Sequence, residues 1–127
     1  MFGPLDFVYL PSRDVAADLD HWTQVGGEVV FAIERFDTRV AMVDLGAGPG
    51  FLLAQHLHGE APVLVYRVDD LAARITDLAG RGVAVTDRFE FPYGEAVEVL
   101  SPGPQRVAIY ERTHPDRGDS LRGRRDF

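Results

Sequence analysis

The order of apolar and polar residues along the first half of the chain predicts a strand and then a helix. Residues 5–10 are almost all apolar and are typical of a buried strand, which Pro11 and Ser12 interrupt. The next apolar residues recur at the spacing of one helix face, because they fall at Val15, Leu19 and Trp22. Two glycines follow Val25 and favour a helix end. The pattern therefore predicts a helix from Val15 to Val25.

Shorter apolar runs separated by turn residues predict the remaining strands. In the first half they are residues 28–34, 38–45 and 51–55. The second half begins with a strand over 63–68, followed by a helix that starts near Leu71 and runs through Arg81. Three more strands then follow, at residues 83–89, 95–100 and 106–111, with a turn or bulge at Pro92-Tyr93-Gly94.

The two halves repeat one another. Laying Phe7 on Val63 places Asp14 on Asp70, an offset of 56 in both pairs, and each aspartate stands where it can cap a helix. The turn Gly48-Pro49 matches Gly103-Pro104 with an offset of 55. The sequence therefore predicts an α+β domain over residues 1–111, built from two tandem βαβββ modules at about 5–56 and 62–111.

The last residues differ in composition from the two modules. Residues 112–127 contain five arginines, three aspartates and few apolar side chains. Such a segment has little apolar surface to bury, so we expect a flexible arginine-rich tail.

Composition excludes several classes of function. The 127 residues carry a net charge of −7, which argues against nucleic acid as a partner, because phosphate backbones are bound mainly by basic side chains. No apolar run is long enough to span a bilayer and no signal-like segment opens the chain, so we expect a cytoplasmic protein without membrane contact. The absence of cysteine and lysine excludes disulfides, thiolate chemistry and Schiff bases.

Several motifs resemble those of the vicinal oxygen chelate superfamily, which includes glyoxalase I, extradiol dioxygenases, and fosfomycin- and bleomycin-resistance proteins. They are the strand-to-acid segments Phe7–Asp14 and Tyr66–Asp70, the helix end His21–Gly27, and Pro92-Tyr-Gly94 followed by Ser101-Pro-Gly103. The resemblance implies a cup-shaped mixed sheet made of two half-cups. It also implies a homodimer, and the exposed edges of open half-cups favour the same expectation.

The resemblance also implies where a metal would bind. Metal-dependent members place ligands near the start of the first strand and in the last strand of each module. In this sequence those positions fall on Phe7, Leu53, Val63 and Ala108. None of these side chains can donate an electron pair to a divalent ion, so we expect no metal and no cofactor.

The same positions predict the wall of the cup. Strand alternation places every second residue on the face that carries them. The expected ligand-binding wall is Phe7, Tyr9, Phe51, Leu53, Gln55, Val63, Val65, Arg67, Arg106, Ala108 and Tyr110. In this wall Arg67 can hold a carboxylate or phosphate, and the tyrosines can present hydroxyl groups. Alternatively, Phe7 and Leu53 pack together and fill the cup.

These observations leave three hypotheses. The leading one is a metal-free protein that sequesters a small aromatic or amphipathic molecule, as bleomycin-resistance proteins do. The second is a lyase, isomerase or dioxygenase-like enzyme, with Glu95, Glu98 or a histidine as base. The third is an interaction module with a filled cup. His56 and His58 lie between the modules and are interpreted as solvent-exposed linker residues.

Overall fold

The structure, a computed structural model, describes residues 1–127 except for the side chain of Pro115. Eight strands form one mixed sheet in the order β2-β3-β4-β1-β5-β8-β7-β6. The first module supplies β1 (Leu5–Pro11), α1 (Val15–Val25), β2 (Glu28–Arg35), β3 (Thr38–Asp44) and β4 (Gly50–Ala54). The second supplies β5 (Val63–Val68), α2 (Leu71–Gly80), β6 (Phe89–Phe91), β7 (Gly94–Val99) and β8 (Arg106–Glu111). A third helix, α3 (Pro115–Leu121), follows.

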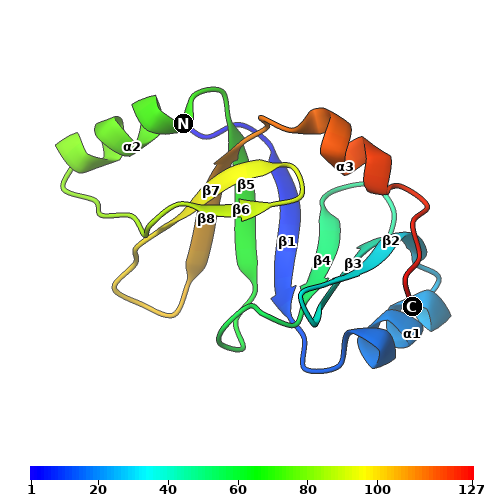
Figure 1. Cartoon of the computed structure of the whole chain (residues 1–127). Coiled ribbons are helices and arrows are strands. Elements are labelled where there is room, and N and C mark those ends of the chain that lie inside the picture. The colour runs from blue at the N-terminus through cyan, green and yellow to red at the C-terminus, as the bar shows by residue number, and fades with distance from the viewer.

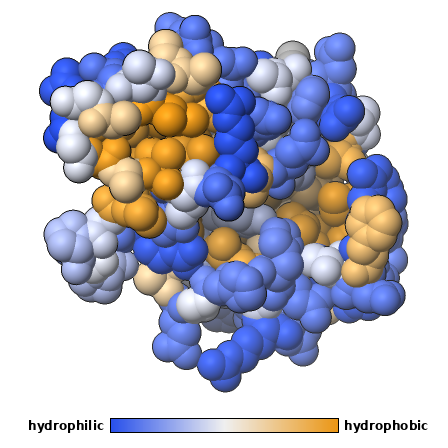
Figure 2. Space-filling view, turned by 60° about the vertical axis from the view of Figure 1, so that its left-hand side comes forward, coloured by the Kyte–Doolittle hydropathy of each residue, from blue (hydrophilic) through white to orange (hydrophobic). Residues whose placement is uncertain are grey.

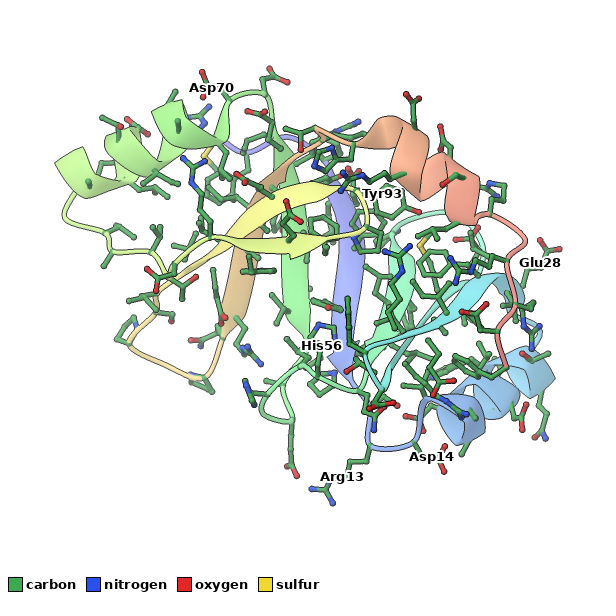
Figure 3. All side chains as sticks on the ribbon, in the orientation of Figure 1. Arg13, Asp14, Glu28, His56, Asp70 and Tyr93 are labelled. Atoms are coloured by element: carbon green, nitrogen blue, oxygen red, sulfur yellow. The ribbon has the colours of Figure 1, made fainter. Side chains whose placement is uncertain are left out.

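The predicted fold class is confirmed, because each run of strand, helix and three strands forms one contiguous half of the sheet. The halves meet where β1 pairs antiparallel with β5, in the middle of the sheet (Figure 1). Asp14 and Asp70 cap the two helices in the same way, each accepting from a backbone N–H three residues later at 3.0 Å. Figure 3 shows these caps at opposite ends of the molecule.

The two faces of the sheet carry different layers. On the outer face, α1 covers the first module with Val15 and Leu19, and α2 covers the second with Leu71. The inner face carries the largest apolar cluster, which includes Phe7, Tyr9 and residues from both modules. The inner face is therefore the interior of the predicted cup.

The structure corrects the predicted register of β4. Leu53 packs with the α1 side chains, and the ring of Phe51 lies 5.8 Å from that of Trp22, so both residues belong to the outer face. Gln55 is exposed and accepts a hydrogen bond from the Arg39 backbone N–H. The inner face instead receives Leu52 and Ala54. The predicted register was wrong by one residue. It followed the offset of 55 between the Gly-Pro dipeptides of the two modules, and the strands themselves are 56 residues apart.

Strand pairing shows why 56 is the correct offset. Tyr9 pairs with Leu52 in the first module, and Val65 pairs with Ala108 in the second. Tyr9 is equivalent to Val65, and Leu52 is equivalent to Ala108. Both the first and the last strands of the two modules are therefore related by an offset of 56 residues. Counted from the last strand pairs, which are Val43 with Phe51 in the first module and Val99 with Val107 in the second, the two connections have equal length, and the Gly-Pro dipeptides lie one residue apart within them.

The predicted strand over residues 83–89 is mostly irregular. Only an isolated bridge from Val85 to Val99 and the short strand β6 form there. The hydroxyl of Thr86 accepts from the Glu98 backbone N–H at 2.9 Å, so a side chain takes the place of a backbone partner in the ladder. This half of the sheet therefore ends in a short edge strand.

The C-terminal segment is ordered against the sheet, and the prediction of a flexible tail at residues 112–127 was wrong. Leu121 of α3 packs into the inner-face cluster and is 9% exposed. The following residues run along the edge of β2, where backbone hydrogen bonds of 2.7–2.8 Å join Gly123, Arg124 and Asp126 to Val30 and Ala32. Phe127 then packs on the outer-face cluster. A few apolar residues, well spaced, are enough to fix this polar segment.

The surface in view in Figure 2 is largely hydrophilic, with apolar residues gathered in separate patches. Of the helices that the structure describes, none has the length and apolar composition required to cross a membrane.

Candidate functional site

Four aromatic rings fill the centre of the inner face. The ring of Phe7 stacks on Tyr93 at 4.8 Å, and the ring of Phe91 meets Tyr110 edge-on at 4.9 Å. We call Phe7, Phe91, Tyr93 and Tyr110 the aromatic cluster. Val63, Val65 and Ala108 belong to the same buried core, so six residues of the predicted wall, counting Tyr9, do lie on the inner face. Most of them fill the centre of the cup.

The residues present do not fit the metal that the resemblance implies. With the register corrected, the four equivalent positions are Phe7, Leu52, Val63 and Ala108, which are all buried in this apolar core. Within the described part of the chain, no three His, Cys, Asp or Glu side chains gather in a way that can hold an ion. Divalent ions need oxygen, nitrogen or sulfur donors, and these positions supply only hydrocarbon.

The two arginines of the predicted wall are engaged with carboxylates at opposite ends of the inner face. Arg67 lies 3.4 Å from Asp6, which also accepts a hydrogen bond from the Tyr110 hydroxyl. Burial and this contact with Asp6 raise the pKa of Tyr110. Arg106 lies 2.8 Å from Glu98 and also donates to the His58 carbonyl. Both guanidinium groups are therefore already paired with a carboxylate.

A cavity of about 420 Å³ remains beside the aromatic cluster. Its walls come from β1, the β2–β3 hairpin, the β6 end and α3, so residues far apart in sequence meet here. Its lining is Tyr9, Ile33, Arg35, Phe36, Thr38, Val40, His56, Glu90, Phe91, Pro92, Arg117, Ser120 and Leu121. We call this space the inner cavity. The cup is therefore filled at its centre and open at one side, which combines the two sequence-based alternatives.

Tyr9 and His56 form a hydrogen-bonded pair in the inner cavity. The Tyr9 hydroxyl lies 2.8 Å from Nε2 of His56, and Figure 3 shows His56 and Tyr93 toward opposite ends of β1. Burial raises the pKa of Tyr9 to about 12, so the hydroxyl keeps its proton at neutral pH. Burial, and then the neighbouring charge of His58, lower the pKa of His56. The pair is therefore neutral near pH 7 and can offer a donor or an acceptor to a ligand.

The lowered pKa of His56 predicts a pH dependence of stability. Between the folded pKa and the ordinary value of 6.5, the unfolded chain binds more protons than the folded one, so folding loses stability as the pH falls through that window. We expect His56→Gln to remove this loss. Urea unfolding of both proteins between about pH 7.5 and pH 5.5 is the measurement. A stability difference between them that stays constant over this range would contradict the assignment.

The carboxylates considered as bases do not face the inner cavity as free groups. Glu95 lies 3.0 Å from Arg88, and Glu98 is held by Arg106. Among the candidate bases named from sequence, only His56 lines the inner cavity. As interpreted from the sequence, His56 is an exposed residue of the segment between the modules, but its ring is in addition bonded to Tyr9.

A second cavity of about 640 Å³ lies on the other side of the molecule, between residues 1–4 and the start of α2. Its arginines are all engaged: Arg67 with Asp6, Arg74 with Asp77 and Arg112 with Asp119. The α2 N-terminus is already capped by Asp70 and by Glu111, which accepts from the Leu71 N–H. This cavity has the larger volume, but its arginines and the α2 N-terminus are already engaged, so the inner cavity is the better candidate.

Sequence reasoning missed much of the inner cavity. Arg35 and Phe36 were assigned to a turn and Arg117 and Leu121 to a tail, so neither segment was expected at the cup. One signal was present for the tail, because Leu121 and Phe127 are large apolar residues in an otherwise polar segment. No local pattern indicates that α3 closes the cavity.

Comparison with known proteins gives the fold. No family model matches the sequence, and no curated protein matches it. Methylmalonyl-CoA epimerase from Mycobacterium tuberculosis superposes with a TM-score of 0.71 and 18% identity, covering 87% of this chain and 88% of that chain.

Two further structures agree with this comparison. A Streptomyces coelicolor methylmalonyl-CoA epimerase variant in complex with 2-nitronate-propionyl-CoA gives a TM-score of 0.73 at 14% identity, over 89% of this chain and 96% of that chain. A variant of glyoxalase I from Zea mays gives 0.66 at 15% identity, over 88% of this chain and 44% of that longer chain. Both enzymes are members of the vicinal oxygen chelate superfamily. The chain therefore has the fold of the vicinal oxygen chelate superfamily.

Proposed function

We propose that this protein binds a small aromatic or amphipathic molecule in the inner cavity without a metal ion. The observation that carries the proposal is the contrast between the two parts of the cup. The positions equivalent to metal ligands are buried hydrocarbon, whereas an open cavity with an apolar floor lies directly beside them.

The composition of the inner cavity supports this function. Pockets for small molecules usually have volumes of roughly 300–1,000 Å³, mostly apolar walls and a few polar groups that fix orientation. Ile33, Val40 and Leu121 supply apolar walls, and the Tyr9–His56 pair supplies polar atoms. Binding by such a cavity needs no chemistry, so sequestration is the simplest function for it.

A second candidate is an enzyme that transfers a proton. Structural neighbours named as methylmalonyl-CoA epimerases and glyoxalase I are enzymes, and His56 is a neutral base that lines the inner cavity. Uptake of deuterium from solvent at a carbon next to a carbonyl group of a bound acyl compound would distinguish this candidate from sequestration.

The fluorescent compound N-phenyl-1-naphthylamine, which is aromatic and uncharged, tests the proposal. We expect chelator-treated protein to bind one molecule per chain with increased fluorescence and a raised melting temperature, because a ligand of the native state stabilises it. Val40→Trp should abolish binding, since the larger side chain occupies the inner cavity. Its control is Leu100→Trp, which alters an exposed leucine elsewhere.

Three results would contradict the proposal. They are no binding to folded wild-type protein, binding that requires an added divalent ion, and unchanged binding by a folded Val40→Trp variant.

A homodimer in the cytoplasm is part of the same proposal. The C-terminal segment covers the edge of β2, and β6 is only three residues long. Little sheet edge is therefore exposed for pairing with a second chain. Light scattering should give twice the chain mass of 14.1 kDa if the dimer forms.

A further inference from the structure

The arginines of this acidic protein differ in whether a carboxylate accompanies them. Nine of the thirteen lie within 4.0 Å of a carboxylate in the structure. Among the described residues, four have no such partner: Arg35, Arg117, Arg122 and Arg125. Two of these four, Arg35 and Arg117, line the inner cavity.

These two arginines reach the inner cavity from different walls. Arg35 is the last residue of β2, and Arg117 belongs to α3. Both are exposed, so they belong to the open side of the inner cavity, whereas Tyr9 and Leu121 are buried at its base. Glu90 is the one carboxylate among the lining residues, and no ion pair joins it to either arginine in the described structure. The lining of the inner cavity therefore carries two arginines and one carboxylate, in a chain with a net charge of −7.

An exposed aromatic side chain stands beside Arg35. Phe36 is 97% exposed and has a φ of +51°, and Asp37 follows with a φ of +60°. Both values lie in the left-handed region, which matches a two-residue hairpin turn but disfavours phenylalanine. An uncharged polar residue or glycine would form this turn more easily and would avoid exposing a ring to water. Phe36 lines the inner cavity but buries almost none of its ring within the chain.

We propose that the occupant of the inner cavity is an organic anion. Its apolar body lies against the buried walls, its negative group is held by Arg35 and Arg117, and Phe36 covers it from the hairpin. This inference rests on the proposed function and specifies its ligand class. Guanidinium groups bind carboxylate, sulfonate and phosphate groups through charge-assisted hydrogen bonds, so the arginines select for negative charge without fixing the identity of the acid.

Two probes with the same aromatic body separate charge from shape. The compound 1-anilinonaphthalene-8-sulfonate carries a sulfonate on the anilinonaphthalene body, and N-phenyl-1-naphthylamine lacks it. We expect wild-type protein to bind the sulfonate about tenfold more tightly than the uncharged compound, since hydrogen bonds to charged groups are stronger than neutral ones. The double variant Arg35→Gln/Arg117→Gln should lose this preference and should bind the uncharged probe within about twofold of wild type.

A control with the same change in net charge makes the comparison specific. Arg13 and Arg81 have side chains that are 93% and 71% exposed and do not line the inner cavity. Arg13→Gln/Arg81→Gln should bind both probes within about twofold of wild type at an ionic strength of about 0.15 M, where distant charges are screened. All titrations use chelator-treated full-length protein.

The outcomes separate this inference from the proposed function. If both probes bind with equal affinity, or if Arg35→Gln/Arg117→Gln keeps the preference for the sulfonate, the anion assignment is wrong and the binding function stands. If folded wild-type protein binds neither probe, the proposed function and this inference fail together. Loss of the preference in Arg13→Gln/Arg81→Gln would show that net charge, and not the inner cavity, selects the anion.

Discussion

Replacing Leu121 with alanine is expected to lower the free energy of unfolding by about 2–3 kcal/mol, because the substitution removes buried methyl groups and leaves space that the backbone cannot fill. Leu121 packs into the inner-face cluster, and its helix is followed by the residues that bond to the edge of β2. Loosening this side chain therefore weakens the whole C-terminal segment. Urea unfolding followed by circular dichroism measures the change.

Leu100→Ala is the matched control, because Leu100 is 54% exposed and its loss should change stability by less than about 0.5 kcal/mol. A shortened chain ending at His114 extends the test. It should be less stable than the full chain and should associate more readily, because it exposes the edge of β2. If Leu121→Ala and the shortened chain were both as stable as wild type, α3 would not be a fixed part of the fold.

Gly94→Ala should have the larger effect, about 3 kcal/mol or more, because the new methyl group cannot be accommodated by a side-chain movement. A Cβ at Gly94 would lie 2.0 Å from the Glu111 carbonyl oxygen, which is backbone of the neighbouring strand β8. The φ of +156° adds to the strain. Relief requires β7 and β8 to separate near Tyr93, which would disturb the aromatic cluster.

The control for this substitution is Gly80→Ala at the end of α2. No atom lies within 4 Å of a Cβ placed at Gly80, so alanine should be neutral or stabilise the chain by up to about 1 kcal/mol. Thermal unfolding and near-ultraviolet circular dichroism of both variants give the comparison. A Gly94→Ala protein with the wild-type melting temperature and aromatic signal would show that β7 does not approach β8 as described.

The architecture could be predicted because the two modules repeat both the pattern and the caps. Helix α1 was predicted with its observed bounds, Val15–Val25, and β5 and β8 were also placed correctly. In each case one chain segment contains the whole signal: an apolar stripe, a capping aspartate or a glycine end. The strand register of β4 was predicted less well. The Gly-Pro dipeptides suggested an offset of 55 between the modules, and this two-residue match was preferred to the offset of 56 given by the first strands and the helix caps.

The inner cavity could be predicted only in part, because it is made by contacts between distant segments. Tyr9 was assigned correctly to the inner face, since strand alternation settles it. The positions of His56 and Arg117 depend on how a linker and a polar C-terminal segment fold back, and single-sequence patterns do not encode such contacts. The filling of the cup by Phe91 and Tyr93 likewise depends on the β6–β7 turn, whose irregularity hid the direction of its side chains.

Aromatic packing fills the centre of this cup. Phe7, Tyr93 and Tyr110 bury their rings there, and buried aromatic rings contribute strongly to stability. The open space lies to one side of these rings, toward the β2–β3 hairpin and α3, where Arg35, Arg117 and Phe36 border the opening. Under the proposed function, binding and stability use different parts of the same inner face.

A crystal structure of chelator-treated protein with 1-anilinonaphthalene-8-sulfonate tests this account most directly. The account predicts density for one aromatic molecule in the inner cavity, in contact with Leu121 and the Tyr9–His56 pair, with no ion near Phe7. Density for the probe only on the outer face, or an ion coordinated between the two modules, would contradict it.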